Sequence, residues 1–207
     1  ELAKEYKLKL IEVLTGFKYI GEKIKEFETS NEYTYEFGYE ESYGCLVGTH
    51  SRDKDAIVAV MLLCEAAAYY KKQGMTLWDQ MVKIYEKYGF YKEKAISVTL
   101  EGVNGLEKIN EIMNNLRQNP PRKFGNYDVE KIRDYKLEKI INMTTGEEDN
   151  TNLPISNVLY YELSNDAWIC IRPSGTEPKI KYYIGVKGNS FKDAEEKLNY
   201  LINSIKE

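Results

Sequence analysis

Apolar and polar positions alternate with different periods along the chain, and these periods predict its elements. Alternating or apolar runs predict strands in the first half at residues 7–14 and 33–37, and a strand or an extended connector at residues 94–100. Helical spacing of apolar positions predicts helices at residues 17–27, from Asp53 or Asp55 to about 72, and from Thr76 to about 89. The first half therefore interleaves helices with short extended segments.

The second half shows a different order of elements. Helical spacing predicts a helix at residues 103–116, which Pro120 and Pro121 terminate, and a closing helix at 191–205. Strands are expected at five places: two within residues 129–141, then 158–163, 167–172 and 179–186. The polar residues 144–152 predict a mobile loop between strands.

These patterns predict two domains with a boundary near residues 95–102. Residues 1–98 are expected to form an α/β domain with a mixed sheet. Residues 99–207 are expected to form an α+β domain whose antiparallel sheet is flanked by helices. A length of 207 residues is sufficient for two small domains.

Composition and charge exclude several classes of protein. The net charge of -4 argues against a surface that coats nucleic acid. No apolar run approaches the roughly 18–20 residues of a membrane-spanning helix, and no cleavable leader is recognisable. The three cysteines are odd in number and far apart, which excludes a disulfide framework and a zinc site and favours the cytoplasm. The chain does not begin with Met, so we expect it to start inside a longer polypeptide.

One loop carries residues suited to bind an anion. Arg172 ends a predicted strand, and residues 173–178 read Pro-Ser-Gly-Thr-Glu-Pro before the next strand begins. The guanidinium of Arg172 matches phosphate oxygens, and the hydroxyls of Ser174 and Thr176 can donate to them. Gly175 can take a positive φ and lets backbone N–H groups approach an anion. A plain hairpin turn with an exposed arginine is the alternative, because Pro-Ser-Gly favours turns of any purpose.

The same loop resembles the C-terminal phosphate-binding loop of the α-D-phosphohexomutases, the superfamily of phosphoglucomutase and phosphomannomutase. Three upstream segments resemble signatures of the third domain of that superfamily, in the same order: Thr-Gly-Phe-Lys-Tyr-Ile-Gly at 15–21, Gly-Tyr-Glu-Glu-Ser-Tyr-Gly at 38–44 and Arg-Asp-Lys-Asp at 52–55. The resemblance covers most of the chain. It implies that residues 1–98 are part of domain three and that residues 99–207 are domain four.

The resemblance also implies which residues contact the sugar. Glu40 and Ser42 share one side of an extended segment, and a carboxylate accepts hydrogen bonds from sugar hydroxyls. The matching Glu and Ser of the superfamily contact the sugar, although the residues alone are also compatible with a solvated acidic turn. Thr15 and Gly16 correspond to a turn near the sugar. Lys54 corresponds to a residue close to the reacting phosphate or sugar, which makes it a candidate for both sugar binding and catalysis.

Two motifs of the superfamily are absent from this sequence. We find neither a nucleophile segment similar to Thr-Ala-Ser-His-Asn-Pro nor a metal loop similar to Asp-Gly-Asp-x-Asp-Arg. We therefore expect neither the phosphoserine nor a metal ligand in this chain. The resemblance implies Mg²⁺ as cofactor of the full-length enzyme and glucose 1,6-bisphosphate as its activator or intermediate.

The resemblance thus predicts the C-terminal portion of a cytoplasmic mutase that interconverts hexose 1-phosphate and hexose 6-phosphate through a bisphosphorylated sugar. The form of the sugar loop favours phosphoglucomutase. Phosphomannomutase, a phosphopentomutase-like enzyme and a non-catalytic phosphosugar-binding module are the alternatives. The expected partners are a phosphorylated hexose and the N-terminal domains of the same polypeptide, with no nucleic acid and no membrane. We expect this piece alone to bind phosphosugar weakly and not to catalyse.

Overall fold

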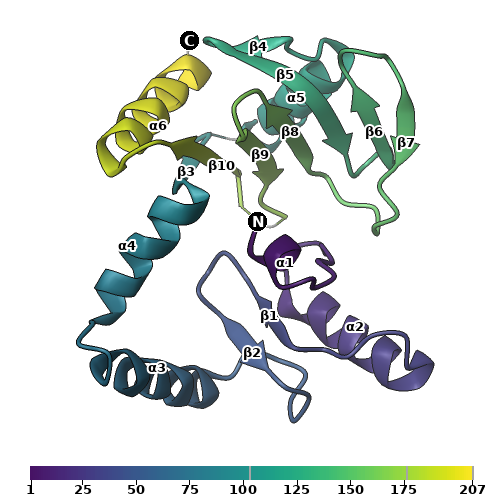
Figure 1. Ribbon diagram of the computed structural model, residues 1–207. Helices are drawn as coiled ribbons and strands as arrows, with labels where there is room; N and C mark the ends of the chain where they lie inside the picture. Colours follow the sequence, from purple (N-terminus) through teal and green to yellow (C-terminus); the bar gives the residue numbers. More distant parts are fainter. Residues whose placement is uncertain (103, 176, 207) are drawn as a thin grey trace. The chain divides into compact units, whose positions relative to one another are not determined.

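The chain folds into two compact units. The computed structural model describes residues 1–102, 104–175 and 177–206 (Figure 1). Contacts between Cα atoms divide the chain into a first unit, Glu1–Ile84, and a second unit, Tyr85–Glu207. The two units differ in how much of their apolar surface is buried, and each contains part of the predicted site.

The first unit consists of helices around a short antiparallel pair of strands. Its elements are α1 (Leu2–Glu5), α2 (Phe17–Ser30), β1 (Phe37–Tyr39), β2 (Cys45–Val47), α3 (Ala56–Lys71) and the first part of α4 (Leu77–Tyr88). In the strand pair, Tyr39 lies opposite Cys45. Phe17 and Ile24 of α2 form a small buried cluster with Leu46 of β2. This cluster holds the hairpin against α2.

Helix α3 of the first unit is apolar on nearly every side. Between its ends, Glu65 is the one charged residue before Lys71. No residue of α3 is buried, and Ile57 is 74% exposed while Met61 is 65% exposed. A helix that is apolar all round is normally enclosed in a core. In this unit α3 therefore presents a large apolar surface to solvent.

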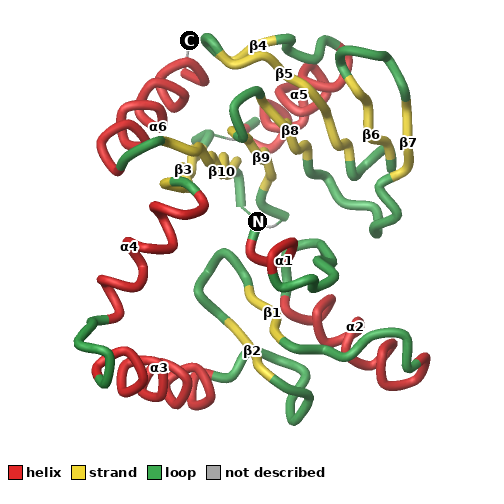
Figure 2. Tube along the Cα trace, in the orientation of Figure 1, coloured by secondary structure: helices red, strands yellow, loops and turns green. Residues whose placement is uncertain are grey.

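The second unit is organised around one antiparallel sheet (Figure 2). Its elements are β3 (Phe90–Thr99), α5 (Gly105–Gln118), β4 (Lys123–Phe124), β5 (Tyr127–Asp134), β6 (Lys139–Asn142), β7 (Glu148–Asn150), β8 (Leu159–Leu163), β9 (Ala167–Pro173), β10 (Lys179–Gly188) and α6 (Phe191–Lys206). The strand order is β3-β10-β9-β8-β5-β6-β7, and β4 pairs with β5. Both β9 and β10 have a strand on either side, so the loop between them joins two interior strands of the sheet.

Alternation along the central strands separates a packed face of this sheet from an open face. In β9, Ile169 and Ile171 are buried, whereas Trp168, Cys170 and Arg172 on the other face are partly covered. The buried cluster also includes residues of both helices: Ile109 and Met113 of α5, and Leu198 and Leu201 of α6. Both helices therefore cover the same face of the sheet.

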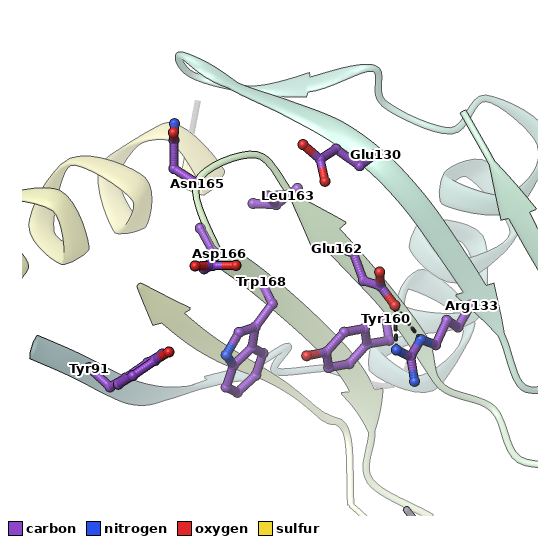
Figure 3. A pocket seen from close by; sticks show the side chains of 10 residues that line it. Tyr91, Glu130, Arg133, Tyr160, Glu162, Leu163, Asn165, Asp166 and Trp168 are labelled. Carbon is purple, nitrogen blue, oxygen red and sulfur yellow. Dashed lines mark hydrogen bonds and ion pairs between the residues drawn. The ribbon is translucent and has the colours of Figure 1, made fainter. Parts of the chain in front are cut away.

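The open face carries a hollow lined by aromatic and charged side chains (Figure 3). Tyr160 and Trp168 stack there with their ring centroids 5.5 Å apart, and the guanidinium of Arg133 lies 5.3 Å from the Tyr160 ring centre. Gly185 lies opposite Trp168 in the β9–β10 register, where a Cβ atom would come within 2.2 Å of the indole nitrogen. The indole can therefore lie against β10 only because residue 185 has no side chain.

A buried ion pair joins α5 to the sheet. Arg117 Nε lies 2.9 Å from Asp134 Oδ2, and only 8% and 6% of the two side chains are exposed. Arg117 also donates to Asn157 Oδ1 at 2.7 Å, and Asp134 Oδ1 accepts from the backbone N–H of Lys136 at 2.9 Å. Because each charge has further hydrogen-bond partners, the desolvation of the pair is compensated.

The predicted fold class is confirmed. The first unit combines helices with a small sheet, and the second has an antiparallel sheet with helices against it, as expected. The structure also confirms five helices near their predicted positions, namely α2, α3, α4, α5 and α6. Asp55, one of the two predicted caps, accepts from the backbone N–H groups of Ile57 and Val58 at 2.8 and 3.2 Å and so begins α3.

Three predictions of local structure were wrong or displaced. Residues 8–14 lie outside any strand, because no described strand pairs with them, and Lys7 turns the chain after α1 with φ 56°. The aromatic strand expected at 33–37 begins only at Phe37, where β2 becomes available as a partner. The polar segment 144–152 includes β7, which pairs with β6. In each case the decisive factor is a strand partner that lies elsewhere in the chain.

The division between the units also differs from the predicted boundary near residues 95–102. The contacts divide the chain between Ile84 and Tyr85. Strand β3 pairs with β10 from Phe90 opposite Gly188 to Thr99 opposite Lys179. Ten residues of pairing attach β3 to the second sheet, and this long-range pairing is not visible in the local pattern.

Candidate functional site

The predicted sugar loop contains a small polar cluster in the first unit. Lys54 Nζ donates to Glu40 Oε2 at 2.8 Å, and the Ser42 hydroxyl donates to the same oxygen at 3.3 Å. The Glu40 side chain is only 9% exposed, whereas half of the Lys54 side chain is exposed. The structure therefore brings together three of the predicted residues, with a carboxylate held between a cation and a hydroxyl.

Gly44 makes room for the side chain of Lys54. A Cβ atom at residue 44 would lie 2.4 Å from Lys54 Cδ, so the aliphatic part of the lysine passes over this glycine. The hydrogen bond to Glu40 raises the pKa of Lys54 above its ordinary value of 10.5, and the charges of Asp53 and Glu41 add to the effect. Lys54 is thus a permanent cation, which can stabilise an anion but is poorly suited to accept a proton.

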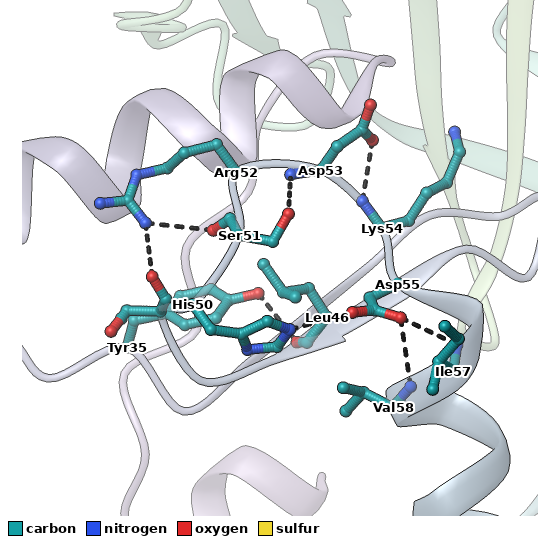
Figure 4. Close-up of polar contacts among 11 residues, drawn as sticks. Tyr35, Leu46, His50, Ser51, Arg52, Asp53, Lys54, Asp55, Ile57 and Val58 are labelled. Carbon is teal, nitrogen blue, oxygen red and sulfur yellow. Dashed lines mark hydrogen bonds and ion pairs between the residues drawn. The ribbon is translucent and has the colours of Figure 1, made fainter.

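The segment that carries Lys54 is held by its own hydrogen bonds (Figure 4). Arg52 donates to the carbonyls of Thr49 and Ser51 at 2.7 and 3.1 Å and pairs with Glu28 of α2. The backbone N–H of Lys54 donates to Asp53 Oδ1 at 2.8 Å. The contacts of Arg52 are all within the protein, so its position supports the loop.

His50, the single histidine of the sequence, lies at the start of α3. Its Nε2 is 3.0 Å from Asp55 Oδ2, the carboxylate that caps this helix. The hydrogen bond from His50, together with the two backbone N–H groups, holds the pKa of Asp55 below its ordinary value. These contacts connect His50 to the capping of α3.

Thr15 and Gly16 lie at the beginning of α2. Gly16 is the N-cap with φ 125°, a conformation that favours glycine, and no side chain caps the first turn. Helix N-termini with open N–H groups attract anions and hydroxyl oxygens. A Cβ atom at Gly21 would lie 2.6 Å from the carbonyl oxygen of Arg52, so α2 packs closely on the segment that carries Lys54. The helix after Thr15 was predicted, whereas the strand expected before it is absent from residues 8–14.

The predicted phosphate loop joins β9 to β10 in the second unit. The backbone N–H of Ser174 donates to the carbonyl of Lys179 at 2.8 Å, and the N–H of Glu177 donates to the Ser174 hydroxyl at 3.3 Å. The backbone N–H of Leu100 donates to the carbonyl of Pro178 at 2.9 Å. The loop is therefore anchored at both ends. Thr176, which was predicted to bind phosphate, lies outside the described residues.

Arg172, near the end of β9, differs from three other arginines of the chain. Arg52, Arg117 and Arg133 all form ion pairs with carboxylates. Arg172 is partly buried, yet among the described residues no carboxylate pairs with it. A partly desolvated guanidinium without a counter-ion is a strong attractor for phosphate.

Gly175 does not adopt the positive φ that its sequence context suggested. Its φ is outside the left-handed region, and a Cβ atom at this residue would meet no heavy atom within 4 Å. The protein itself therefore does not require a glycine at this position. The open space over residue 175 leaves room for a bound group to approach the backbone.

The described residues contain neither a cluster suited to bind a metal ion nor a helix suited to span a membrane. Within residues 1–102, 104–175 and 177–206, no group of three or more His, Cys, Asp or Glu side chains is arranged to hold a metal ion. These residues therefore do not fit the Mg²⁺ of the superfamily. In the same part of the chain, no helix combines the length and apolar character needed to cross a membrane.

Comparisons with known proteins agree with this arrangement. Residues 1–88 match the family described as "Phosphoglucomutase/phosphomannomutase, alpha/beta/alpha domain III". A phosphoglucomutase of Staphylococcus aureus (strain USA300) is 38% identical over 203 residues, which is 98% of this chain and 36% of that protein. The chain belongs to the phosphohexomutase superfamily. It corresponds to the C-terminal part of the proteins in that superfamily, as predicted from the four motifs.

Other relatives of the phosphohexomutase superfamily extend the comparison. The phosphoglucomutase of Staphylococcus aureus (strain MSSA476) is 37% identical over 203 residues, again 98% of this chain and 36% of that protein. The open form of parafusin, a phosphoglucomutase from Paramecium, superposes with a TM-score of 0.61 at 16% identity and covers 99% of this chain and 35% of that one. The chain thus spans about a third of the length of these relatives, and the fold is shared even where the sequences have diverged.

Gly44 belongs to the segment 38–44 that the sequence singled out, but its contact with Lys54 was not predicted. It is the last residue of the Gly-Tyr-Glu-Glu-Ser-Tyr-Gly segment, and nothing in its local context indicates that a lysine ten residues later will pass over it. A signal was nevertheless present, because a glycine beside a charged loop often marks a close approach of another group. The contact explains why Lys54 can reach Glu40.

Proposed function

We propose that this chain is the sugar- and phosphate-binding portion of a phosphoglucomutase, which interconverts hexose 1-phosphate and hexose 6-phosphate through a bisphosphorylated sugar. The observation that carries the proposal is Arg172 of the Arg-Pro-Ser-Gly-Thr-Glu-Pro loop, with which no carboxylate among the described residues pairs, in a chain that aligns over 98% of its length with a phosphoglucomutase. The proposed phosphate loop is held in place because it joins two interior strands of the sheet. No carboxylate among the described residues pairs with Arg172 and so competes with phosphate for it.

The two units are proposed to recognise different parts of the substrate. In the first unit, Glu40 and Ser42 would accept and donate hydrogen bonds to sugar hydroxyls, with Thr15 and Gly16 nearby in the same unit. Lys54 would add a positive charge close to the reacting phosphate. In the second unit, Arg172, Ser174, Gly175 and Thr176 would hold a phosphate group.

The chemical step itself is proposed to depend on residues outside this chain. The phosphoserine segment and the metal loop of the superfamily are absent from the sequence. A bound Mg²⁺ would neutralise charge on the transferred phosphoryl group in the full-length enzyme, and glucose 1,6-bisphosphate would be its intermediate. We accordingly propose that the full-length protein is a cytoplasmic phosphoprotein and that this chain alone has no mutase turnover.

The exposed apolar surface of α3 favours a contact with another domain of the same polypeptide. Ile57, Val60, Met61 and Leu63 of α3 are each more than half exposed. Burial of such side chains contributes about 1.5–3 kcal/mol each. We propose that the N-terminal domains of the full-length phosphoglucomutase supply residues that cover α3.

Calorimetric titration with glucose 1,6-bisphosphate tests the phosphate site. The wild-type chain is expected to bind, and the Arg172→Ala variant is expected to lose most of this affinity because the planar cation is removed. Arg122→Ala is the matched control, since Arg122 is exposed and lies outside the loop. Equal affinity in the wild type and Arg172→Ala would contradict the proposal. Mutase turnover by the wild-type chain above that of Arg172→Ala would contradict the absence of chemistry.

A pair of neighbouring glutamates tests the sugar site. Glu40 pairs with Lys54, whereas Glu41 is exposed and belongs to the turn between β1 and β2. Glu40→Gln should lower affinity for glucose 1,6-bisphosphate about tenfold or more, the loss expected for charge-assisted hydrogen bonds, and Glu41→Gln should change it little. The same affinity loss in both variants would show that only the general acidity of the loop matters.

A further inference from the structure

The hollow on the open face of the second sheet is separate from the predicted phosphate loop. It lies beside the turn that joins β8 to β9, and Trp168 of its lining stands near the beginning of β9. Arg172 follows four residues later, and four residues of a strand span about 13 Å. The hollow has a volume of about 400 Å³, within the roughly 300–1,000 Å³ typical of ligand pockets. It is therefore a candidate for a second site in this unit.

Aromatic rings form one part of the hollow. The rings of Tyr160 and Trp168 are nearly parallel, with an interplanar angle of 12°, and both are partly exposed. Tyr91 of β3 adds a third ring, which is 41% exposed. Gly185 lets the indole lie against β10, so the strand fixes its position. Aromatic rings that stay accessible in a concave surface can bind the apolar face of a ligand.

Charged side chains surround these rings as donor–acceptor pairs. Glu162 accepts from Arg133 Nε at 2.6 Å, and Asp166 Oδ2 lies 3.0 Å from Lys187 Nζ. Figure 3 shows the pair of Arg133 and Glu162 beside the Tyr160 ring. Each pair sets a hydrogen-bond acceptor next to a donor. A hydroxyl group placed there can donate to the carboxylate and accept from the cation at the same time.

Two further polar side chains of the lining are not used by the protein. Among the described residues, none forms a hydrogen bond or an ion pair with the carboxylate of Glu130 or the side-chain amide of Asn165. Asn165 and Asp166 belong to the turn between β8 and β9, with φ of 62° and 57°. Asn and Asp adopt this left-handed conformation more readily than most residues. The turn therefore positions these polar groups at the hollow before any ligand binds.

The charges around the hollow are balanced, which argues against an ionic ligand. The carboxylates of its lining are Glu130, Glu162 and Asp166, and the cations beside them are Arg133, Lys131 and Lys187. An anion would be repelled by the carboxylates, and a cation would be repelled by the basic groups. A neutral molecule with many hydroxyl groups and one apolar face avoids both repulsions and uses both kinds of group.

We propose that this hollow binds a neutral saccharide, with the C–H face of a pyranose ring against the aromatic rings of Tyr160 and Trp168. The sugar hydroxyls donate to the carboxylates of the lining and accept from the guanidinium of Arg133 and from the amide of Asn165. The inference goes beyond the proposed function, because it concerns a sugar without phosphate at the end of β9 that lies away from the phosphate loop.

Titration of the isotope-labelled complete chain with maltose, followed by NMR, tests the site. The backbone signals of Asn165 and Asp166 and the indole signal of Trp168 are expected to shift together, with a single dissociation constant. The sequence contains two tryptophans, so Trp78→Phe identifies which indole signal belongs to Trp168. Joint shifts of these signals support the inference.

Two pairs of variants test the chemistry of the hollow. Trp168→Leu keeps apolar volume but removes the ring, and it should weaken maltose binding about tenfold, whereas Trp168→Phe should stay within about threefold of the wild type. Glu130→Gln should also weaken binding about tenfold, because a charged acceptor is lost. Its control is Glu111→Gln on α5, an exposed residue of the helix that covers the opposite face of the sheet. Since Glu130 is exposed, its substitution keeps the test informative even if Trp168→Leu does not fold.

The outcomes separate this inference from the proposed function. Shifts confined to the signals of Glu40 and Lys54 would place maltose in the sugar loop and overturn the inference. Absence of any shift would also overturn it, and so would equal affinities of Glu130→Gln and Glu111→Gln. If tetramethylammonium shifts the signals of the hollow and maltose does not, the hollow is a cation site instead. Maltose binding at Trp168 without any binding of glucose 1,6-bisphosphate would contradict only the proposed function.

Discussion

The two units hold their binding loops in different ways. In the second unit, residues from α5, α6 and the central strands form one continuous buried cluster, and the phosphate loop joins two strands of that core. In the first unit only Phe17, Ile24 and Leu46 form a buried cluster, and α3 is exposed. The sugar loop there depends on ion pairs, caps and close glycine contacts. The comparison indicates that the predicted phosphate loop is held by a well-packed sheet, whereas the predicted sugar loop is held by local polar contacts.

The largest effect is expected from the buried ion pair of the second unit. Arg117→Ala leaves the carboxylate of Asp134 buried without its cation, which should cost about 3–5 kcal/mol in the free energy of unfolding. The exposed pair of Lys123 and Asp128 provides the control, and Lys123→Ala should cost at most about 1 kcal/mol. Chemical denaturation followed by tryptophan fluorescence measures both. If both variants lost at most about 1 kcal/mol in the free energy of unfolding, the buried ion pair would be no more important for stability than the exposed one.

A matched pair of leucines compares the two units directly. Leu201 of α6 is fully buried, and Leu201→Ala should lower the free energy of unfolding by about 2–5 kcal/mol. Leu63 of α3 is 59% exposed, so Leu63→Ala should change it by no more than about 0.5 kcal/mol. Urea titration of both variants tests the difference. A cost for Leu63→Ala as large as that for Leu201→Ala would mean that α3 is covered in the isolated chain.

A single methyl group tests the local geometry of the sugar loop. Gly44→Ala places a Cβ atom 2.4 Å from Lys54 Cδ, so the lysine side chain must shift and its contact with Glu40 is disturbed. Affinity for glucose 1,6-bisphosphate should fall about tenfold, the loss of one charge-assisted contact, with little change in the thermal midpoint. Calorimetry and thermal unfolding distinguish the two quantities. Unchanged affinity would mean that Lys54 does not act through its position over residue 44.

The smallest effect is expected at the cap of α3 and depends on pH. The folded-state pKa of Asp55 is held below its ordinary value of 3.8 by His50 and by backbone N–H groups. Its stabilisation is therefore present above the unfolded-state pKa and is lost as the pH falls through the lower folded-state pKa. Helicity of Asp55→Ala should be below that of the wild type at pH 7, and the difference should vanish at the acid end of a titration to about pH 2. A constant difference would assign the effect to something other than the carboxylate.

The elements that were predicted well are those with a strong local signal. The amphipathic helices α2, α5 and α6 and the strands β8, β9 and β10 lie close to their predicted positions, because their period is written in adjacent residues. The cap was narrowed to Asp53 or Asp55 for the same reason, and the structure shows that it is Asp55. Residues 8–14 were assigned wrongly because an apolar alternation forms a strand only when a partner strand is present.

In the candidate site, too, some features were evident from the sequence and others only from the structure. Glu40, Ser42 and Lys54 were each singled out, and the structure adds that all three meet at one carboxylate oxygen. The role of Gly44 could not be predicted, since it depends on the path of a side chain ten residues away. That no carboxylate among the described residues pairs with Arg172 likewise depends on the residues that surround it in the fold.

The sequence by itself determined the family and the fold class, because motifs and periodicities are properties of neighbouring residues. Only the tertiary structure decided that β3 belongs to the second sheet, that Arg117 is buried against Asp134, and that Lys181 lies opposite Arg172. Strand register and side-chain pairing join residues far apart in the chain. Their energies depend on burial and on the charges that meet there, which no local pattern specifies.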